Sequence, residues 1–129
     1  MRIRGGGDSL LPRTILGGLA DYSPQPVDFV EPARIMAAKG ATALFVPTNN
    51  ALPANRARPE LVSQARNVDI ARAIDNSVSV IRVDVSGSVG HLLSYGSSAI
   101  VDSDGRVLQS APLFTEKLLV ADICPQSLQ

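Results

Sequence analysis

Apolar and polar residues change their spacing several times along the chain, and each change predicts a different element. Residues 1–27 hold only a short apolar run broken by glycine, so this segment is predicted to be an irregular leader. From residue 28 the pattern becomes regular. A helix is predicted over 32–39, because proline suits a first helical turn and Gly40 suits the left-handed cap after it.

The middle of the chain predicts a strand, a loop and a second helix. The apolar run 41–46 is short and ends before a proline, which favours a buried strand. Residues 48–58 are polar and predict a loop. A helix is predicted to start near 59–60. Its apolar residues recur every three or four positions and predict one buried stripe: Leu61, Ala65, Val68, Ala71 and Ile74.

The last third of the chain predicts strands alone. Alternation favours a strand over 77–83, followed by a glycine- and serine-rich loop over 86–95. An Asp-Gly turn predicts a hairpin between 98–101 and 106–108, since these residues tolerate a positive φ. A final strand is predicted over 118–123. The fold class is therefore α/β, in layers, with two helices and about five strands in one domain.

Composition excludes several classes of partner. The 129 residues are 45% hydrophobic and 19% charged, with a formal net charge of zero, which is typical of a globular domain. No basic cluster and few aromatic residues are present, so nucleic acid is not an expected partner. No apolar run reaches the length of a membrane span, and no membrane association is expected.

The only cysteine and the only histidine do not predict a site. Cys124 cannot form an internal disulfide, which agrees with a cytoplasmic location. It lies close to the C-terminus, and we interpret it as an ordinary terminal thiol. His91 lies in a glycine- and serine-rich segment, and we interpret it as a surface residue. One histidine and one distant cysteine are too few for a zinc site, so neither a metal nor a cofactor is expected.

Six short segments resemble sequence motifs of one enzyme family. In the first, Phe29, Glu31 and Arg34 have the spacing of a Phe-Pro-Glu-x-x-Arg motif, and in another Asp75 stands where an Arg-Ala-x-Glu-Asn motif has glutamate. The segments occur in the family's order, at 29–34, 37–41, 47–49, 71–76, 95–100 and 104–108. In these segments the chain is similar to the C-terminal half of the nitrilase superfamily, the carbon–nitrogen hydrolases.

The resemblance implies a fold and a chemistry. Complete members form an α-β-β-α sandwich and hydrolyse small amides or nitriles with a Glu-Lys-Cys triad, in which a thiolate attacks the carbon. The cysteine would fall near Pro24 and the next acidic residue near Pro26, so neither is matched. No catalytic residue is carried over. We expect 28–129 to be the C-terminal half of such a domain, truncated or frameshifted and inactive alone.

The resemblance also assigns candidate site residues. Thr48, Asn49 and Asn50 would lie at a strand end beside the substrate pocket, although an asparagine-stabilised turn alone is the simpler explanation. Four further motif residues would support the active site or subunit contacts, or form ordinary surface ion pairs three residues apart: Glu31, Arg34, Arg72 and Asp75.

Three functions remain open at this point. The first is an amidase-like protein of the carbon–nitrogen hydrolase family, with a small amide or nitrile as substrate in complete relatives and a homo-oligomer as its expected state. The second is a non-catalytic interaction module that associates with itself or with an intact paralogue through an exposed apolar face. The third is a small hydrolase that uses Cys124 or a serine.

Overall fold

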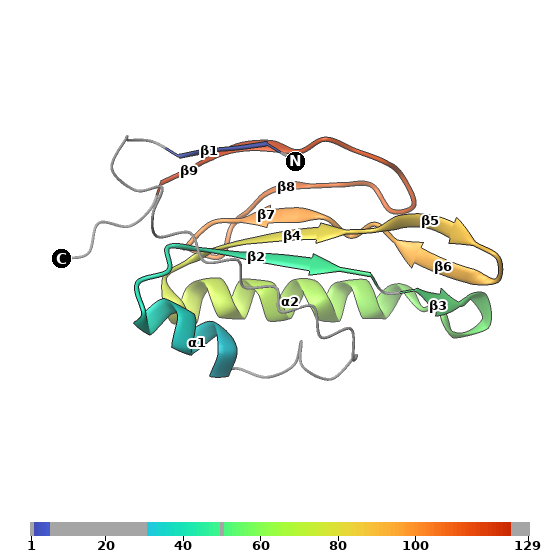
Figure 1. Cartoon of the computed structure of the whole chain (residues 1–129), viewed down its shortest axis with the longest axis horizontal. Coiled ribbons are helices and arrows are strands. Elements are labelled where there is room, and N and C mark those ends of the chain that lie inside the picture. Colours follow the sequence, from blue (N-terminus) through green and yellow to red (C-terminus); the bar gives the residue numbers. More distant parts are fainter. Residues whose placement is uncertain (1, 6–30, 50, 125–129) are drawn as a thin grey trace.

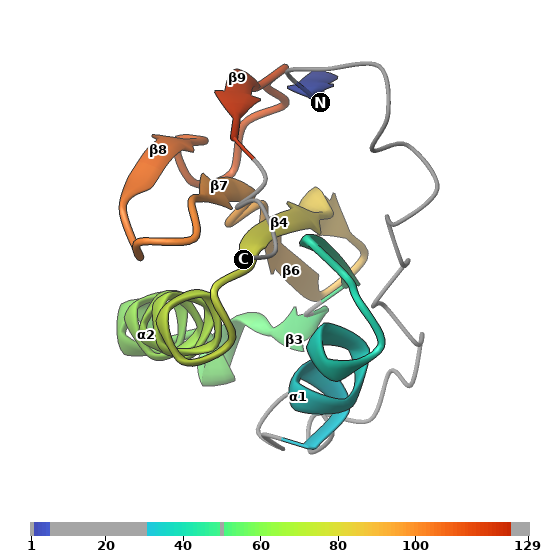
Figure 2. The same cartoon turned by 90° about the vertical axis from the view of Figure 1, so that its left-hand side faces the viewer.

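The computed structural model describes residues 2–5, 31–49 and 51–124 of the 129-residue chain. Two helices lie side by side on one face of a four-stranded sheet (Figures 1 and 2). They are α1 (Glu31–Ala38) and α2 (Pro59–Asn76). α1 ends as predicted, because Gly40 has φ +98° and its N–H donates to the carbonyl of Ala37 at 2.9 Å. No helix in these ranges is both long and apolar enough to cross a membrane.

The four-stranded sheet has the order β2-β4-β7-β8. Its strands are β2 (Ala43–Thr48), β4 (Ser79–Asp84), β7 (Ala99–Val101) and β8 (Val107–Ser110). β2 and β4 are parallel, because α2 carries the chain back between them, and the later pairs are antiparallel. The β7–β8 hairpin is confirmed, and Gly105 in its turn has φ +83°.

Two smaller sheets complete the described structure. A three-stranded sheet of order β3-β6-β5 extends from one end of the main sheet, and β1 pairs with β9 on the side opposite the helices (Figures 1 and 2). The strands of the first are β3 (Leu52–Pro53), β5 (Ser86–Val89) and β6 (Leu92–Tyr95). Those of the second are β1 (Arg2–Gly5) and β9 (Val120–Ile123), which are parallel.

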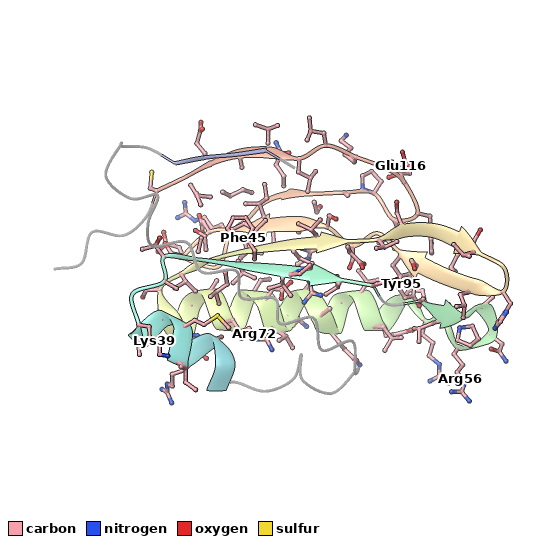
Figure 3. All side chains as sticks on the ribbon, viewed as in Figure 1. Lys39, Phe45, Arg56, Arg72, Tyr95 and Glu116 are labelled. Carbon is pink, nitrogen blue, oxygen red and sulfur yellow. The ribbon has the colours of Figure 1, made fainter. Side chains whose placement is uncertain are left out.

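The main sheet divides the apolar core into two clusters. The cluster on the helix side contains Ala33, Ala41, Leu44, Ala73, Val78, Val80 and Val101. The cluster on the β9 side contains Ala43, Ile81, Ile100, Ala111, Leu119 and Ile123, with Phe45 packed against it (Figure 3). Alternate side chains of β2 and β4 therefore point to opposite faces of the sheet, as expected for a sheet buried on both sides. The predicted α/β class is confirmed.

Three sequence expectations differ from the structure. The segment predicted as a loop over 86–95 forms the hairpin of β5 and β6, since Gly90 supplies a turn with φ +60°. The predicted loop over 48–58 contains β3 and a short 3-10 helix, Ala54–Arg56. Within the predicted leader, residues 2–5 form β1, and the rest of the leader lies outside the described residues.

The predicted apolar stripe of α2 is wrong. Leu61 and Ile74 are 37% and 53% exposed, whereas the buried residues of this helix are Asp69 and Ala73. The inner face of α2 therefore lies on a different side from the one that the apolar spacing indicates. The cause is Arg82 of β4, whose guanidinium points at α2 and requires a carboxylate there.

Candidate functional site

The carboxyl ends of the two parallel strands meet at one edge of the main sheet. Thr48, the last residue of β2, is in register with Asp84, the last residue of β4. The Thr48 hydroxyl donates a hydrogen bond of 3.0 Å to the Asp84 carboxylate. Ligands of open α/β sheets bind outside such strand ends, and this edge is therefore the candidate site.

Asp84 connects three chain segments through one buried carboxylate. Besides the bond from Thr48, its second oxygen accepts bonds from the Ser97 N–H and the Ser97 hydroxyl, both at 2.8 Å. The Asp84 N–H donates to the Ser98 hydroxyl at 2.9 Å. Three donors thus bind this carboxylate, which acts as an anchor for the strand ends.

The segment that follows β6 is fixed from the helix side as well. Arg66 of α2 donates from Nη2 to the Ser97 carbonyl at 3.1 Å. Gly96 has φ +64°, and a Cβ at this position would lie 2.4 Å from the Cβ of Ser86. Only glycine fits here, so the chain passes directly against the start of β5.

A buried ion pair lies behind the strand ends. The Arg82 guanidinium donates two hydrogen bonds to the Asp69 carboxylate, at 2.6 and 2.8 Å, and the two residues are 1% and 0% exposed. Burial alone would lower the pKa of Arg82. The hydrogen bond and charge of Asp69, together with the charge of Asp84, outweigh burial and raise this pKa above its usual value. Arg82 therefore remains charged.

Arg66 is the one incompletely bonded charge in this network, as far as the structure describes it. Its Nη1 is buried and has no hydrogen-bond partner among the described residues. Burial lowers the pKa of Arg66, the charge of Asp69 opposes this effect, and the charge of Arg82 adds to it. Because the nitrogen is inaccessible even to a water-sized probe, it offers no room for a ligand in this conformation.

A hollow of about 220 Å³ lies at the same end of β4, beside the connection between β8 and β9. Val83 and Asp84, the last two residues of β4, both line it. The other lining residues come from the start of β5, from the segment before β7, and from the connection between β8 and β9. These are Ser86, Ser98, Ala111, Thr115, Glu116 and Lys117.

The structure brings two of the three predicted pocket residues to this edge. Thr48 bonds Asp84, as described, and the Asn49 side chain accepts a bond of 3.2 Å from the Ser94 hydroxyl. Asn50 lies outside the described residues. Both described side chains connect neighbouring segments, and whether they also contact a substrate remains a prediction.

The four predicted supporting residues lie on the helices. Glu31 is the first residue of α1, and its side chain is outside the described part. Arg34 is exposed on α1, and Asp75 is exposed near the end of α2. Arg72 lies on α2, partly buried, and its carbonyl accepts a bond from Asn76 at 3.0 Å (Figure 3). Of the described side chains, neither Arg34 nor Asp75 takes part in the hydrogen bonds at the strand ends.

Cys124 and His91 lie in separate parts of the fold. Cys124 directly follows β9 and is exposed. His91 is exposed in the turn between β5 and β6, where its carbonyl accepts the N–H of Ala54 at 3.3 Å. In the ranges that the structure describes, no three His, Cys, Asp or Glu side chains gather as they would around a metal.

Sequence reasoning missed the residues that organise this site. Arg82 and Asp84 stand at alternate positions of β4, each directly after an apolar residue, and Asp69 lies on the helix before the strand. Charged residues in a buried strand need partners, so their alternation in β4 is a signal from which the pairing is predictable. The role of Ser97 has no such signal, because it depends on a main-chain N–H as well as on the hydroxyl.

The family match covers all of the described structure except β1. The family model for carbon–nitrogen hydrolases matches residues 26–129, which include every helix and every strand from α1 to β9. The chain belongs to the carbon–nitrogen hydrolase family. The predicted resemblance to the nitrilase superfamily is thereby confirmed. The chain has no significant match among curated protein sequences.

Solved structures of this family share the fold. A carbon–nitrogen hydrolase from Helicobacter pylori is 26% identical, with a TM-score of 0.62 over 68% of this chain and 34% of its own. A Saccharomyces cerevisiae member of branch 10 of the nitrilase superfamily is 26% identical, with a TM-score of 0.57 over 70% of this chain and 31% of its own. This chain thus spans about a third of their length.

An amidase from Nesterenkonia sp. is a third similar structure. It is 28% identical, with a TM-score of 0.55 over 67% of this chain and 31% of its own. A mutant of that amidase with its cysteine changed to alanine binds butyramide, and a double mutant binds acrylamide. In another mutant, the acetamide moiety of fluoroacetamide is attached to the active-site cysteine. These amides are ligands of the amidase.

Proposed function

We propose that this chain forms the C-terminal part of a carbon–nitrogen hydrolase that acts on small amides or nitriles. The observation that carries the proposal is the family match over 26–129, which contains every described helix and strand except β1. In this proposal Thr48 and Asn49, with Asn50 after them, form one wall of the substrate pocket. Asp84 holds that wall in place through Thr48.

The described residues supply the wall and not the nucleophile. Cys124 is exposed after the last strand, and positions 24 and 26, where the resemblance expects the cysteine and the following acidic residue, are prolines. We infer that the triad is encoded outside 28–129 and that this chain is a truncated or frameshifted form. Its single thiol agrees with a cytoplasmic location.

Sequencing the gene upstream in all three frames tests this proposal. We expect a frame that encodes a glutamate, a lysine and a cysteine-bearing strand leading into residue 28. The restored protein is then expected to release ammonia from butyramide or acrylamide, and the 129-residue chain to release none. Absence of such a frame, or ammonia release by the short chain itself, would overturn it.

A second candidate is a non-catalytic interaction module, either self-associating or bound to an intact paralogue. It is favoured by four large apolar side chains at the β4 end of the sheet and on the β8–β9 connection, which are 44 to 65% exposed: Val83, Val85, Phe114 and Leu118. Exposed apolar surface of this kind favours association. Light scattering after size-exclusion chromatography tests this candidate, with the chain alone and mixed with an intact family member. A stable monomer that binds no family member would exclude the interaction module.

A further inference from the structure

The connection between β8 and β9, residues 111–119, forms a strap. Contacts made by the first half of the strap hold it in place. The Ala111 N–H donates to the Ser98 carbonyl at 2.9 Å, and the Phe114 N–H donates to the Tyr95 carbonyl at 2.7 Å. The Phe114 ring also packs on the Tyr95 ring, with centroids 5.6 Å apart. These contacts fix the strap above the end of β4.

Phe114 adopts an unusual backbone conformation within the strap. Its φ is +62°, a region that aromatic residues rarely occupy. Such a conformation persists only where surrounding contacts enforce it, and it is frequent beside binding sites. Here the two contacts with Tyr95 enforce it, and the following three residues, 115–117, are carried over the hollow.

The polar groups around the hollow divide into bonded and unbonded ones. The Asp84 carboxylate accepts bonds from Thr48 and Ser97. Ser98 accepts the Asp84 N–H, and the Thr115 hydroxyl donates to the Pro112 carbonyl at 2.7 Å. Across the described chain, three lining side chains have neither a hydrogen bond nor an ion pair. They are the hydroxyl of Ser86, the carboxylate of Glu116 and the ammonium of Lys117.

The unbonded groups include one negative and one positive charge on the same rim. Glu116 and Lys117 are consecutive and exposed, and Figure 3 shows Glu116 on the strap over the end of the main sheet. Their opposite charges form no ion pair with one another. Val83 and Ala111 supply an apolar part of the lining beneath them.

We propose that this hollow binds a small zwitterion that carries an ammonium and a carboxylate on a short carbon chain. The ligand's ammonium faces Glu116, its carboxylate faces Lys117, and Ser86 supplies a further hydrogen bond. The volume of about 220 Å³ lies below the range of about 300 to 1,000 Å³ that is usual for drug-sized ligands. The hollow therefore selects a molecule the size of a simple amino acid.

Titration of the ¹⁵N-labelled full chain in low-salt buffer tests this site directly. The probes are glycine, β-alanine and 4-aminobutyrate, which differ in the distance between the two charges. We expect at least one of them to shift the amide resonances of Ser86, Ala111 and Lys117 with a millimolar Kd, on the order expected for so few atoms. Acetate and methylammonium, each with a single charge, are expected to shift them at least tenfold more weakly.

Two variants and a matched control complete the test. Glu116→Gln and Lys117→Gln each remove one charged hydrogen-bonding partner and are expected to weaken binding by about tenfold. Lys39→Gln removes an exposed charge beyond the end of α1, away from the hollow, and is expected to leave binding unchanged (Figure 3).

Specific results would overturn the proposal. These are the absence of shifts with all three zwitterions, equal binding of acetate, or an equal Kd for all variants. Because the titration measures binding and not hydrolysis, failure of the proposed hydrolase function would not affect its outcome.

Discussion

Two regions at the end of β4, the buried ion-pair network and the hollow, differ in how their polar groups are used. On the helix side, Asp69, Arg82 and Asp84 are buried and bonded to other parts of the chain. At the hollow, which Asp84 also lines, the hydroxyl of Ser86 and the charges of Glu116 and Lys117 have no partners among the described residues. Bonded buried groups hold architecture together, whereas unbonded groups at a hollow remain available to a ligand.

The largest expected loss of stability comes from removing a buried charge on the helix side. Asp69→Ala leaves the Arg82 guanidinium buried without its carboxylate, and we expect a loss of about 3 to 5 kcal/mol in the free energy of unfolding. Asp75→Ala on the exposed side of α2 is the control, expected to change stability by less than about 0.5 kcal/mol. Urea unfolding measures both, and equal effects would contradict the role of the pair.

The combined replacement Asp69→Leu with Arg82→Met sharpens the same point. A buried ion pair replaced by apolar residues of similar volume is often neutral or stabilising. We therefore expect the double variant to recover most of the stability lost in Asp69→Ala. Recovery would show that the damage in the single variant comes from the unpaired Arg82. A double variant as unstable as the single one would contradict this explanation.

The next largest effect is expected at Gly96, which lies directly against Ser86 at the start of β5. Gly96→Ala combines a positive φ, which costs about 1 to 2 kcal/mol, with a Cβ 2.4 Å from the Cβ of Ser86. Overpacking adds about 1 to 3 kcal/mol. Gly90→Ala is the matched control, because its φ of +60° is similar and nothing lies within 4 Å of its Cβ.

Thermal unfolding of the two glycine variants separates the contributions of strain and contact. We expect Gly96→Ala to lower the melting temperature clearly more than Gly90→Ala does. The difference measures the close approach alone, since the backbone conformations are alike. Indistinguishable melting temperatures would mean that β5 moves away from residue 96 without cost.

A smaller loss of stability is expected from substitutions of Asp84. Its size depends more on the shape of the new side chain than on the loss of charge. Asp84→Ala leaves the donors of Thr48 and Ser97 without an acceptor and is expected to cost about 2 to 3 kcal/mol. In Asp84→Asn the amide oxygen still accepts from Ser97 while the amide N–H₂ donates to the Thr48 hydroxyl, so the expected cost is about 1 kcal/mol. Hydrogen exchange of the Ser97 amide is measured in both variants. If Asp84→Asn lost as much protection at this amide as Asp84→Ala, the anchor role of Asp84 would be contradicted.

The smallest expected effect is at Tyr95, which links the strap to the loop before α2. Tyr95→Phe removes the hydrogen bond of 2.9 Å from its hydroxyl to the Arg58 carbonyl and keeps the ring contact with Phe114. We expect a loss of about 1 kcal/mol in urea unfolding and unchanged binding in the hollow. Weaker zwitterion binding would show that the strap depends on this hydrogen bond.

The sequence predicts those elements whose local signals agree with their tertiary setting. The Asp-Gly turn and Gly40 identify the β7–β8 hairpin and the end of α1, because both depend on a positive φ. Apolar spacing fails in α2, where the partner of Arg82 decides which side is buried. The β5–β6 hairpin is missed for a related reason, since its glycine and serine content masks a register set by pairing.

The candidate site is less predictable than the fold. Thr48 and Asn49 are found from a strand end and a resemblance, and the structure gives them hydrogen-bond partners 36 and 45 residues away in sequence. The hollow joins β4, β5 and the strap, which no local pattern connects. Contacts between distant segments of this kind follow from tertiary packing, and a single sequence carries little information about them.

The central claim is that this chain supplies part of a carbon–nitrogen hydrolase without its nucleophile. Fluoroacetamide tests it, because a reactive thiolate displaces fluoride and keeps the acetamide group, as at the active-site cysteine of the Nesterenkonia amidase mutant. Intact mass is followed over time, with ammonia release from butyramide measured alongside. We expect Cys124 to react no faster than a small free thiol, with no ammonia released. Rapid stoichiometric labelling together with ammonia release that Cys124→Ser abolishes would contradict the claim.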